Sequence, residues 1–260
     1  MFSLPVSNCP VFPDSSNGDI LSLVHVIIGL MKYMGSKNRI AKDILPIMLK
    51  CRSPEMAWVE PFVGGANIID KVEGTRIGSD INPYLIQALI SIRDYVDDLP
   101  KNSKEFTEND YRNLKLDDSY KHKGYAGFAF SYGGKWLGGW SRNSSGKRDY
   151  VAESYRNAMK QSPNLQGINF RVCSYLELEV PANSLIYCDP PYFGTTSYKN
   201  KFDSAKFWDW CRAKKQEGHT VFVSEYTAPD DFQCVWEKEI VSSLTKNTGA
   251  KKGVEKLFTL

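Results

Sequence analysis

The sequence predicts an α/β fold built on a mostly parallel sheet. The first observation behind this prediction is a repeated rhythm: residues 56–94 read strand, glycine turn, helix, strand and helix, and residues 165–225 return to it. The second is that the sharpest motif directly follows an apolar strand, where open α/β sheets bind ligands. With 42% hydrophobic and 24% charged residues among 260, the chain is expected to fold.

Each expected element has a local signal. Apolar residues at helical spacing predict helices, Asn82-Pro83 is a cap followed by proline at the first helical position, and Gly218 marks a helix end. Pro46 is expected to kink or end the first helix. The expected helices cover residues 36–48, 66–72, 82–92, 150–161 and 203–217. The expected strands cover residues 56–60, 75–80, 168–173, 184–188 and 220–225, with a terminal hairpin at 234–241 and 254–260.

We expect one α/β domain, made of residues 31–94 and 165–260, with an insertion at residues 95–164. Residues 1–30 hold three prolines, two acids and no lysine or arginine, and they show no clear period. We therefore expect them to be an N-terminal extension, either disordered or upstream of a functional start at Met31.

Composition excludes several classes of protein. No run of 18 apolar residues exists, so a membrane-spanning helix is not expected. Six scattered cysteines without a CxxC pair argue against a zinc site and a disulfide framework, and predict free thiols in the cytoplasm. The histidines have neither metal spacing nor a nucleophile beside them; we expect His219 at a strand edge and His25 and His122 on the surface. The net charge of +3 leaves any nucleic-acid signal to local segments.

The sharpest motif is Asp189-Pro190-Pro191-Tyr192, after the apolar run 185–188. It suits an exocyclic amino group, which is a poor nucleophile because its lone pair is conjugated into a ring. The Asp189 carboxylate and the Pro190 carbonyl can accept the two amino hydrogens and favour a pyramidal nitrogen with an available lone pair. Tyr192 offers a π-face for the ring. The alternative is a purely structural role, in which the two prolines form a rigid turn capped by Asp189. The placement of the other motifs argues against it.

The second motif is Glu60-Pro61-Phe62-Val63-Gly64-Gly65, followed by Asp80 at the end of the next expected strand. Glycines let the backbone approach a ligand closely, and an acid at that strand end can accept both hydroxyls of a ribose. Taken alone, a Gly-Gly turn is a common packing feature. Its spacing differs from GxGxxG, which counts against a nicotinamide-dependent enzyme.

Together with Tyr33-Met34-Gly35-Ser36-Lys37 and Ser79-Asp80-Ile81-Asn82-Pro83, these motifs resemble the Dam-type DNA adenine methyltransferases. The order of cofactor motif, insertion and DPPY is that of the alpha group. The resemblance covers residues 31–260 and is to a phage- or prophage-like member. It implies a Rossmann-like methyltransferase sheet that binds S-adenosylmethionine and methylates the amino group of a flipped adenine at specific DNA sites.

The resemblance also implies residue roles. The cofactor-binding residues would be Tyr33, Lys37, Phe62, Gly64, Gly65, Asp80 and Asp189. The catalytic residues would be Asp189, Pro190 and Tyr192. No metal is implied. Outside their motif, Tyr33 would simply be a core tyrosine and Lys37 a solvated lysine.

The insertion departs from the best-known family members because GFAFSYGGKWLGGWSR stands where their GATC-recognition segment is expected, so the target sequence does not transfer. Residues 121–148 hold six basic residues, no acid, seven glycines and six aromatics, which suits a DNA surface. One aromatic could fill the gap left by a flipped base, although most are expected to form a small core of the insertion's own. The expected phosphate contacts are Lys123, Lys135, Arg142, Lys147 and Arg148.

Two alternatives stay open. One is a methyltransferase acting on an RNA base or a protein amide. The basic insertion argues against the protein substrate, and the resemblance implies the same from Asp189 at the head of its motif. The other is a DNA-binding relative without catalysis, which cofactor binding would exclude. Double-stranded DNA is the expected partner. A cognate restriction endonuclease, the strand preference and the oligomeric state are not determined by the sequence.

Overall fold

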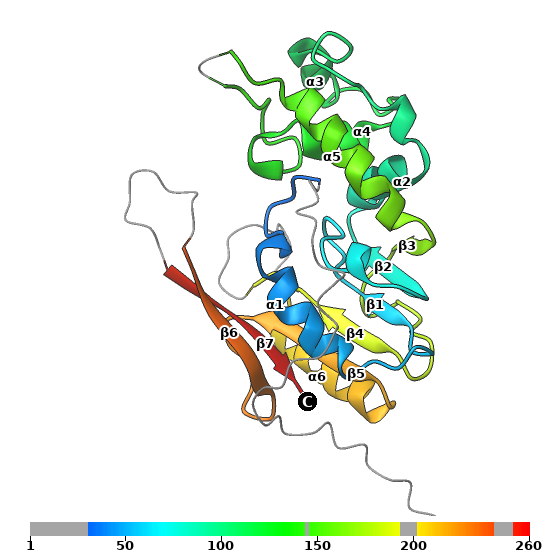
Figure 1. Cartoon of the computed structure of the whole chain (residues 1–260), viewed down its shortest axis with the longest axis vertical. Coiled ribbons are helices and arrows are strands. Elements are labelled where there is room, and N and C mark those ends of the chain that lie inside the picture. Colours follow the sequence, from blue (N-terminus) through cyan, green and yellow to red (C-terminus); the bar gives the residue numbers. More distant parts are fainter. Residues whose placement is uncertain (1–30, 144–145, 193–201, 242–251) are drawn as a thin grey trace, which may run out of the picture.

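The computed structural model describes residues 31–143, 146–192, 202–241 and 252–260, so the expected extension at residues 1–30 lies outside the described part. A seven-stranded sheet forms the centre of the molecule, in the order β3-β2-β1-β4-β5-β7-β6 (Figure 1). The strands are β1 Trp58–Glu60, β2 Arg76–Asp80, β3 Ile168–Val172, β4 Leu185–Cys188, β5 Thr220–Glu225, β6 Gln233–Val241 and β7 Lys252–Thr259. The first five are parallel and β7 is antiparallel to both of its neighbours, which confirms the α/β class and the terminal hairpin.

The strand order reverses between β1 and β4. From β1 the chain passes outward to β2 and β3, then returns to β4 on the other side of β1. Ligands of open α/β sheets bind at such a point, beyond the carboxyl ends of the strands. Glu60 ends β1 and Asp189 follows β4, so both predicted motifs lie at this point.

The sheet is buried on both faces. Along β4, Leu185 and Tyr187 belong to one hydrophobic cluster, and Ile186 and Cys188 to another. Because successive side chains of a strand point to opposite faces, the two clusters lie on the two sides of the sheet. This explains the continuous apolar runs that predicted buried strands.

The helices are α1 Asn38–Leu49, α2 Pro83–Asp94, α3 Glu108–Asn113, α4 Lys123–Ala129, α5 Tyr150–Leu165 and α6 Ser204–Gln216. The predicted cap is present, since the Asn82 side chain accepts a hydrogen bond from the backbone of Tyr84 at 3.0 Å. Gly218 follows α6 with φ of 93°, as its role at the helix end requires. No described helix is long and apolar enough to cross a membrane.

One local prediction was wrong, and of the two effects expected of Pro46 the structure excludes one. The helix expected at residues 66–72 is only a 3-10 turn, η1 Ile69–Lys71. Ala66 has φ of 57°, so the segment starts from a left-handed residue and cannot begin as a regular α-helix. Pro46 also does not end α1, which continues to Leu49; its buried stripe, including Ile44 and Met48, packs into the core and offsets the lost hydrogen bond.

The insertion packs closely against the sheet domain (Figure 1). Trp136 stacks on Tyr84 of α2 with ring centroids 4.3 Å apart. A Cβ on Gly124 of α4 would lie 2.1 Å from the Tyr84 carbonyl oxygen, so only glycine permits this approach. Phe128 and Phe130 are buried as expected, but in the same cluster as the sheet residue Trp58. The expectation that they form a core of the insertion's own was therefore wrong.

Candidate active site

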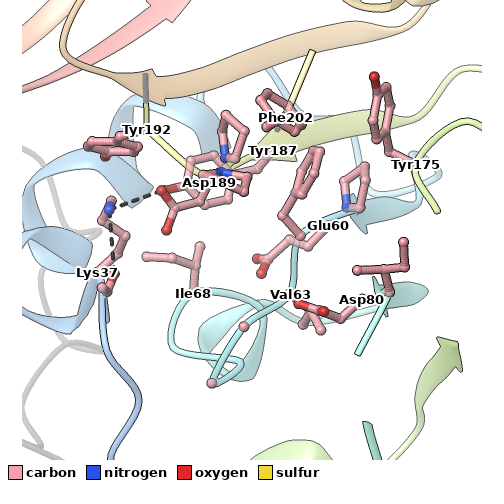
Figure 2. A pocket seen from close by; sticks show the side chains of 18 of the residues that line it. Lys37, Glu60, Val63, Ile68, Asp80, Tyr175, Tyr187, Asp189, Tyr192 and Phe202 are labelled. Carbon is pink, nitrogen blue, oxygen red and sulfur yellow. Dashed lines mark hydrogen bonds and ion pairs between the residues drawn. The ribbon is translucent and has the colours of Figure 1, made fainter. Parts of the chain in front are cut away.

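One pocket of about 830 Å³ opens beyond the carboxyl ends of the central strands (Figure 2). Many separate segments supply its walls, among them the loop before α1, the turn after β1, the end of β2, the loop after β4 and Glu255 of β7. All nine residues that the sequence singled out for cofactor binding or catalysis line it: Tyr33, Lys37, Phe62, Gly64, Gly65, Asp80, Asp189, Pro190 and Tyr192. The fold thus brings together side chains that lie far apart in the sequence.

Gly64 and Gly65 of the glycine turn lie where any Cβ atom would be crowded. Gly64 has φ of 51°, and a Cβ there would approach the Tyr33 ring to 3.1 Å. A Cβ on Gly65 would lie 2.9 Å from the Asn67 amide nitrogen. The turn therefore presents bare backbone to the pocket, with Tyr33 directly behind it.

Asp80 ties the end of β2 to this turn. Its carboxylate accepts a hydrogen bond from the Asn82 backbone at 2.9 Å and another from the Gly64 backbone. Burial raises the pKa of Asp80 to about 6, and the two backbone hydrogen bonds oppose that rise. The two hydrogen bonds fix the position of the carboxyl group. Its burial makes ionisation costly.

Aromatic rings form one wall of the pocket. Phe62 lies 5.3 Å from the Tyr175 ring centroid and 5.9 Å from that of Phe202 (Figure 2). Such a wall suits a flat, uncharged ring. Tyr175 and Phe202 are not among the predicted site residues, and nothing in their local sequence indicates that they reach the pocket.

An ion pair occupies the opposite end. The Lys37 ammonium lies 2.9 Å from Asp189 Oδ1, 3.8 Å from Glu255 Oε2 and 4.4 Å from the Tyr192 ring centroid (Figure 2). The Tyr192 hydroxyl donates a 2.7 Å hydrogen bond to Glu255. Burial raises the pKa of Asp189, and Lys37 partly offsets the rise. Burial alone would lower the pKa of Lys37, but Asp189 and Glu255 leave it above its ordinary value.

Glu60 is a further acid that the predicted site omits. Its side chain is buried beside the pocket and accepts a 2.8 Å hydrogen bond from the Trp58 indole. Burial raises the pKa of Glu60 well above its usual range, and nearby Asp70 and Asp189 add to the rise. Besides Glu60, whose raised pKa favours its uncharged form, the described lining holds four carboxyl groups, on Asp80, Asp189, Asp203 and Glu255, against the ammonium groups of Lys37 and Lys206. The pocket therefore favours a ligand that carries positive charge.

The predicted phosphate contacts lie outside this pocket and differ in exposure. Lys123 is buried, with its ammonium 2.7 Å from Asp118, so it is not available as a surface contact. Arg142 is paired with Glu108, and Arg148 with Glu153. Lys135 and Lys147 are exposed.

The two described histidines serve the fold, and His25 lies outside the described residues. His122 is buried, with Nδ1 3.1 Å from the Ser91 hydroxyl, so its predicted surface position was wrong. His219 lies directly before β5 and accepts a hydrogen bond from the Ser184 backbone at 3.1 Å. The described residues include no group of three or more metal-ligating side chains. The described cysteines are free thiols: Cys51, Cys173, Cys188, Cys211 and Cys234.

Comparisons with known proteins fit this site. Residues 33–123 match the D12 class N6 adenine-specific DNA methyltransferase family. The Type II methyltransferase M.FokI of Planomicrobium okeanokoites is 23% identical over 214 residues, which are 71% of this chain. The aligned part is 32% of M.FokI, so the chain spans about a third of that relative.

A solved structure of SMU.472, described as a methyltransferase complexed with SAH, aligns with 86% of this chain and 52% of its own. The sequence identity is 9% and the TM-score is 0.33. A superposition this loose supports no conclusion about the site.

Proposed function

Because residues 33–123 match the D12 class N6 adenine-specific DNA methyltransferase family, we propose that this chain is such an enzyme and methylates adenine at specific sites in double-stranded DNA. The methyl donor is S-adenosylmethionine, and the acceptor is the exocyclic amino group of a flipped adenine. The observation that carries the proposal is that the nine residues to which the resemblance gives roles lie in one pocket, although they are far apart in the sequence. Asp189, Pro190 and Tyr192 are the catalytic residues.

The pocket suits this donor at three points. The bare backbone at Gly64 and Gly65 leaves room for a ligand to approach, and Asp80 is held where it can accept ribose hydroxyls. Phe62 and Tyr175 suit the adenine ring of the donor. When bound, S-adenosylmethionine supplies a methyl group on a positively charged sulfonium, and the excess of carboxyl groups in the pocket favours that charge.

The chain contributes orientation and electrostatics rather than a nucleophile. The Asp189 carboxylate and the Pro190 carbonyl accept the two hydrogens of the amino group and turn its lone pair toward the methyl carbon. Tyr192 stacks on the base. As the new N–C bond formed, the bond from the methyl carbon to sulfur would break and the donor would leave as the uncharged thioether. Asp189 would stabilise the positive charge on the nitrogen until one amino proton is lost to solvent. A paired, stacked adenine cannot reach this pocket, so the base must leave the duplex.

The insertion supplies the DNA-facing surface in this proposal. Lys135 and Lys147 are exposed and suited to phosphates. Tyr132 is 68% exposed, whereas the other five aromatics of residues 121–148 are buried or half-buried. Its loop is fixed against the loop before α1, because a Cβ on Gly134 would lie 2.7 Å from the Lys32 carbonyl oxygen. Tyr132 is therefore the aromatic that fills the gap left by the flipped base.

The test is to incubate unmethylated DNA with the protein and S-adenosylmethionine and to identify modified nucleosides by mass spectrometry. We expect N6-methyladenine, and none with Asp189→Ala, which should still bind the donor. Methylcytosine would overturn the choice of base. Donor binding without any methylated DNA nucleoside would favour an RNA or protein substrate, and absence of both would favour a DNA-binding relative without catalysis.

The proposal places the protein in the cytoplasm, where its DNA substrate and methyl donor are available. M.FokI is named as a Type II methyltransferase. A restriction endonuclease as partner of the present chain would be tested by co-purification, with a solitary enzyme as the other outcome.

A further inference from the structure

Glu255 connects the last strand of the sheet to the base end of the pocket. It lies on β7, between β5 and β6, and lines the pocket. One oxygen, Oε2, accepts a 2.7 Å hydrogen bond from the Tyr192 hydroxyl and lies 3.8 Å from the Lys37 ammonium. The next residue, Lys256, pairs instead with Glu237 on β6 at 3.4 Å. The Glu255 side chain thus makes its contacts in the pocket, whereas the Lys256 side chain makes its contact with the neighbouring strand β6.

Lys37 stands in the way of the target base. Its ammonium is 2.9 Å from Asp189 Oδ1, the carboxylate that has to accept a hydrogen from the amino group. It also lies 4.4 Å from the centre of the Tyr192 ring, the ring on which the base stacks in the proposed function. The Lys37 ammonium must move away from the Asp189 carboxylate and the Tyr192 ring, or share them with the base, before the base can take up a reactive position.

Lys37 needs another counter-ion when it leaves Asp189. Its side chain is only 10% exposed, and an unpaired ammonium at such a depth is costly. Among the described residues, its ion pairs are with Asp189 and Glu255 alone. To form a full charge-assisted hydrogen bond with Glu255, the ammonium has only to close 3.8 Å to about 2.8 Å.

We propose that Glu255 is a positioning residue that receives the Lys37 ammonium when the target base engages Asp189. The inference rests on the proposed function, since it assigns Asp189 to the amino group. Through its second contact, Glu255 also keeps the Tyr192 ring at the edge of the base site. The Tyr226 ring supports Tyr192 from the other side, with centroids 4.6 Å apart and the planes at 82°. The ion pair therefore exchanges partners within the pocket instead of leaving it.

The decisive substitution is Glu255→Gln, which removes the charge and keeps an oxygen acceptor for the Tyr192 hydroxyl. We expect kcat for adenine methylation to fall about tenfold or more, because Lys37 then stays on Asp189. The KM for donor should change less than about twofold. Glu255→Asp, which keeps the charge, should restore much of kcat. Glu237→Gln is the matched control on the neighbouring strand and should leave kcat unchanged.

A double-mutant cycle separates this role from general support of the fold. In a Lys37→Met background, Glu255→Gln should change kcat by less than about twofold, because no ammonium remains to be received. An equal loss in both backgrounds would overturn the inference, as would a Glu255→Gln enzyme as active as Glu237→Gln. Wild-type protein without any adenine methylation would instead overturn the proposed function, and the inference would fall with it.

Discussion

Gln161 of α5 donates from its amide nitrogen to the carbonyl oxygen of Gly65 at 3.0 Å, across 96 positions of sequence. Its side-chain oxygen accepts from the Met31 backbone at 3.1 Å. The residue is fully buried. One side chain of the insertion thus holds the glycine turn of the proposed donor site and the start of the loop that carries Lys37.

Gln161→Leu should weaken both the fold and the binding of S-adenosylmethionine. The substitution leaves the Gly65 carbonyl and the Met31 amide buried without this partner, at a cost of about 1–3 kcal/mol each. Part of this free-energy cost is a distortion of the glycine turn that contains Gly65. We expect the donor Kd, measured by calorimetry, to rise about tenfold. Gln166→Leu is the control, since Gln166 bonds to Arg93 away from the pocket; an equal rise there would remove the special role of Gln161.

Gly64→Ala tests the left-handed turn. An alanine at φ of 51° is strained by about 1–2 kcal/mol, and its Cβ would press on the Tyr33 ring at 3.1 Å. Gly74→Ala is a matched control, because Gly74 has φ of 81° and an equal 3.1 Å approach to Arg52 outside the pocket. Both variants should lose similar thermal stability, and only Gly64→Ala should lose donor binding. Intact donor binding by Gly64→Ala would remove the turn from the site.

Asp80 should make the ligand-free protein less stable as pH rises. Its pKa is about 6 in the folded chain, above the ordinary value of 3.8, so folding favours the protonated form. The stability that the protonated form contributes is therefore complete below pH 4 and lost as pH rises through 6. Asp80→Asn, which cannot ionise, should be more stable than wild type at pH 8, by on the order of 3 kcal/mol. The difference should vanish near pH 4 in urea unfolding.

The same substitution should impair function. An ionised Asp80 accepts both ribose hydroxyls, so donor affinity of the wild type should increase as pH rises through about 6. Asp80→Asn should bind S-adenosylmethionine weakly at every pH. If Asp80→Asn were more stable than wild type and bound S-adenosylmethionine as tightly as wild type at pH 8, Asp80 would be excluded from the donor site.

Substitution of the exposed lysines of the insertion should affect DNA binding, whereas substitution of the buried lysine should affect stability. Lys135→Ala with Lys147→Ala should weaken DNA binding and lower the salt slope by about two, since each phosphate contact contributes about 0.9. Lys123→Ala should leave the slope unchanged and lower thermal stability, because Lys123 is buried against Asp118. The measurement is DNA affinity across a salt series. The reverse pattern would place the DNA on the other side of the insertion.

Local signals made several elements predictable. The Asn82-Pro83 start of α2 was predicted because a cap and a first-turn proline act within one turn of helix. The apolar run of β4 and the Asp189 motif behind it were predictable for a similar reason, since burial on both faces requires an unbroken apolar strand. Motif spacing likewise predicted which residues would share a pocket, because parallel strands bring their carboxyl ends to one edge.

Other features depend on contacts between distant segments. No local signal separates Lys123, buried against Asp118, from Lys135, which is exposed. The place of Glu255 beside Lys37 depends on β7 being inserted between β5 and β6.

Local signals in the sequence therefore predicted the strands, four of the six described helices and the motifs of the proposed site, because caps, strand patterns and motifs act over a few residues. Only the tertiary structure decided which charges are paired and buried. Burial and ion pairing are set by whichever element packs opposite, and that element can lie more than 200 residues away, as β7 does from the loop before α1.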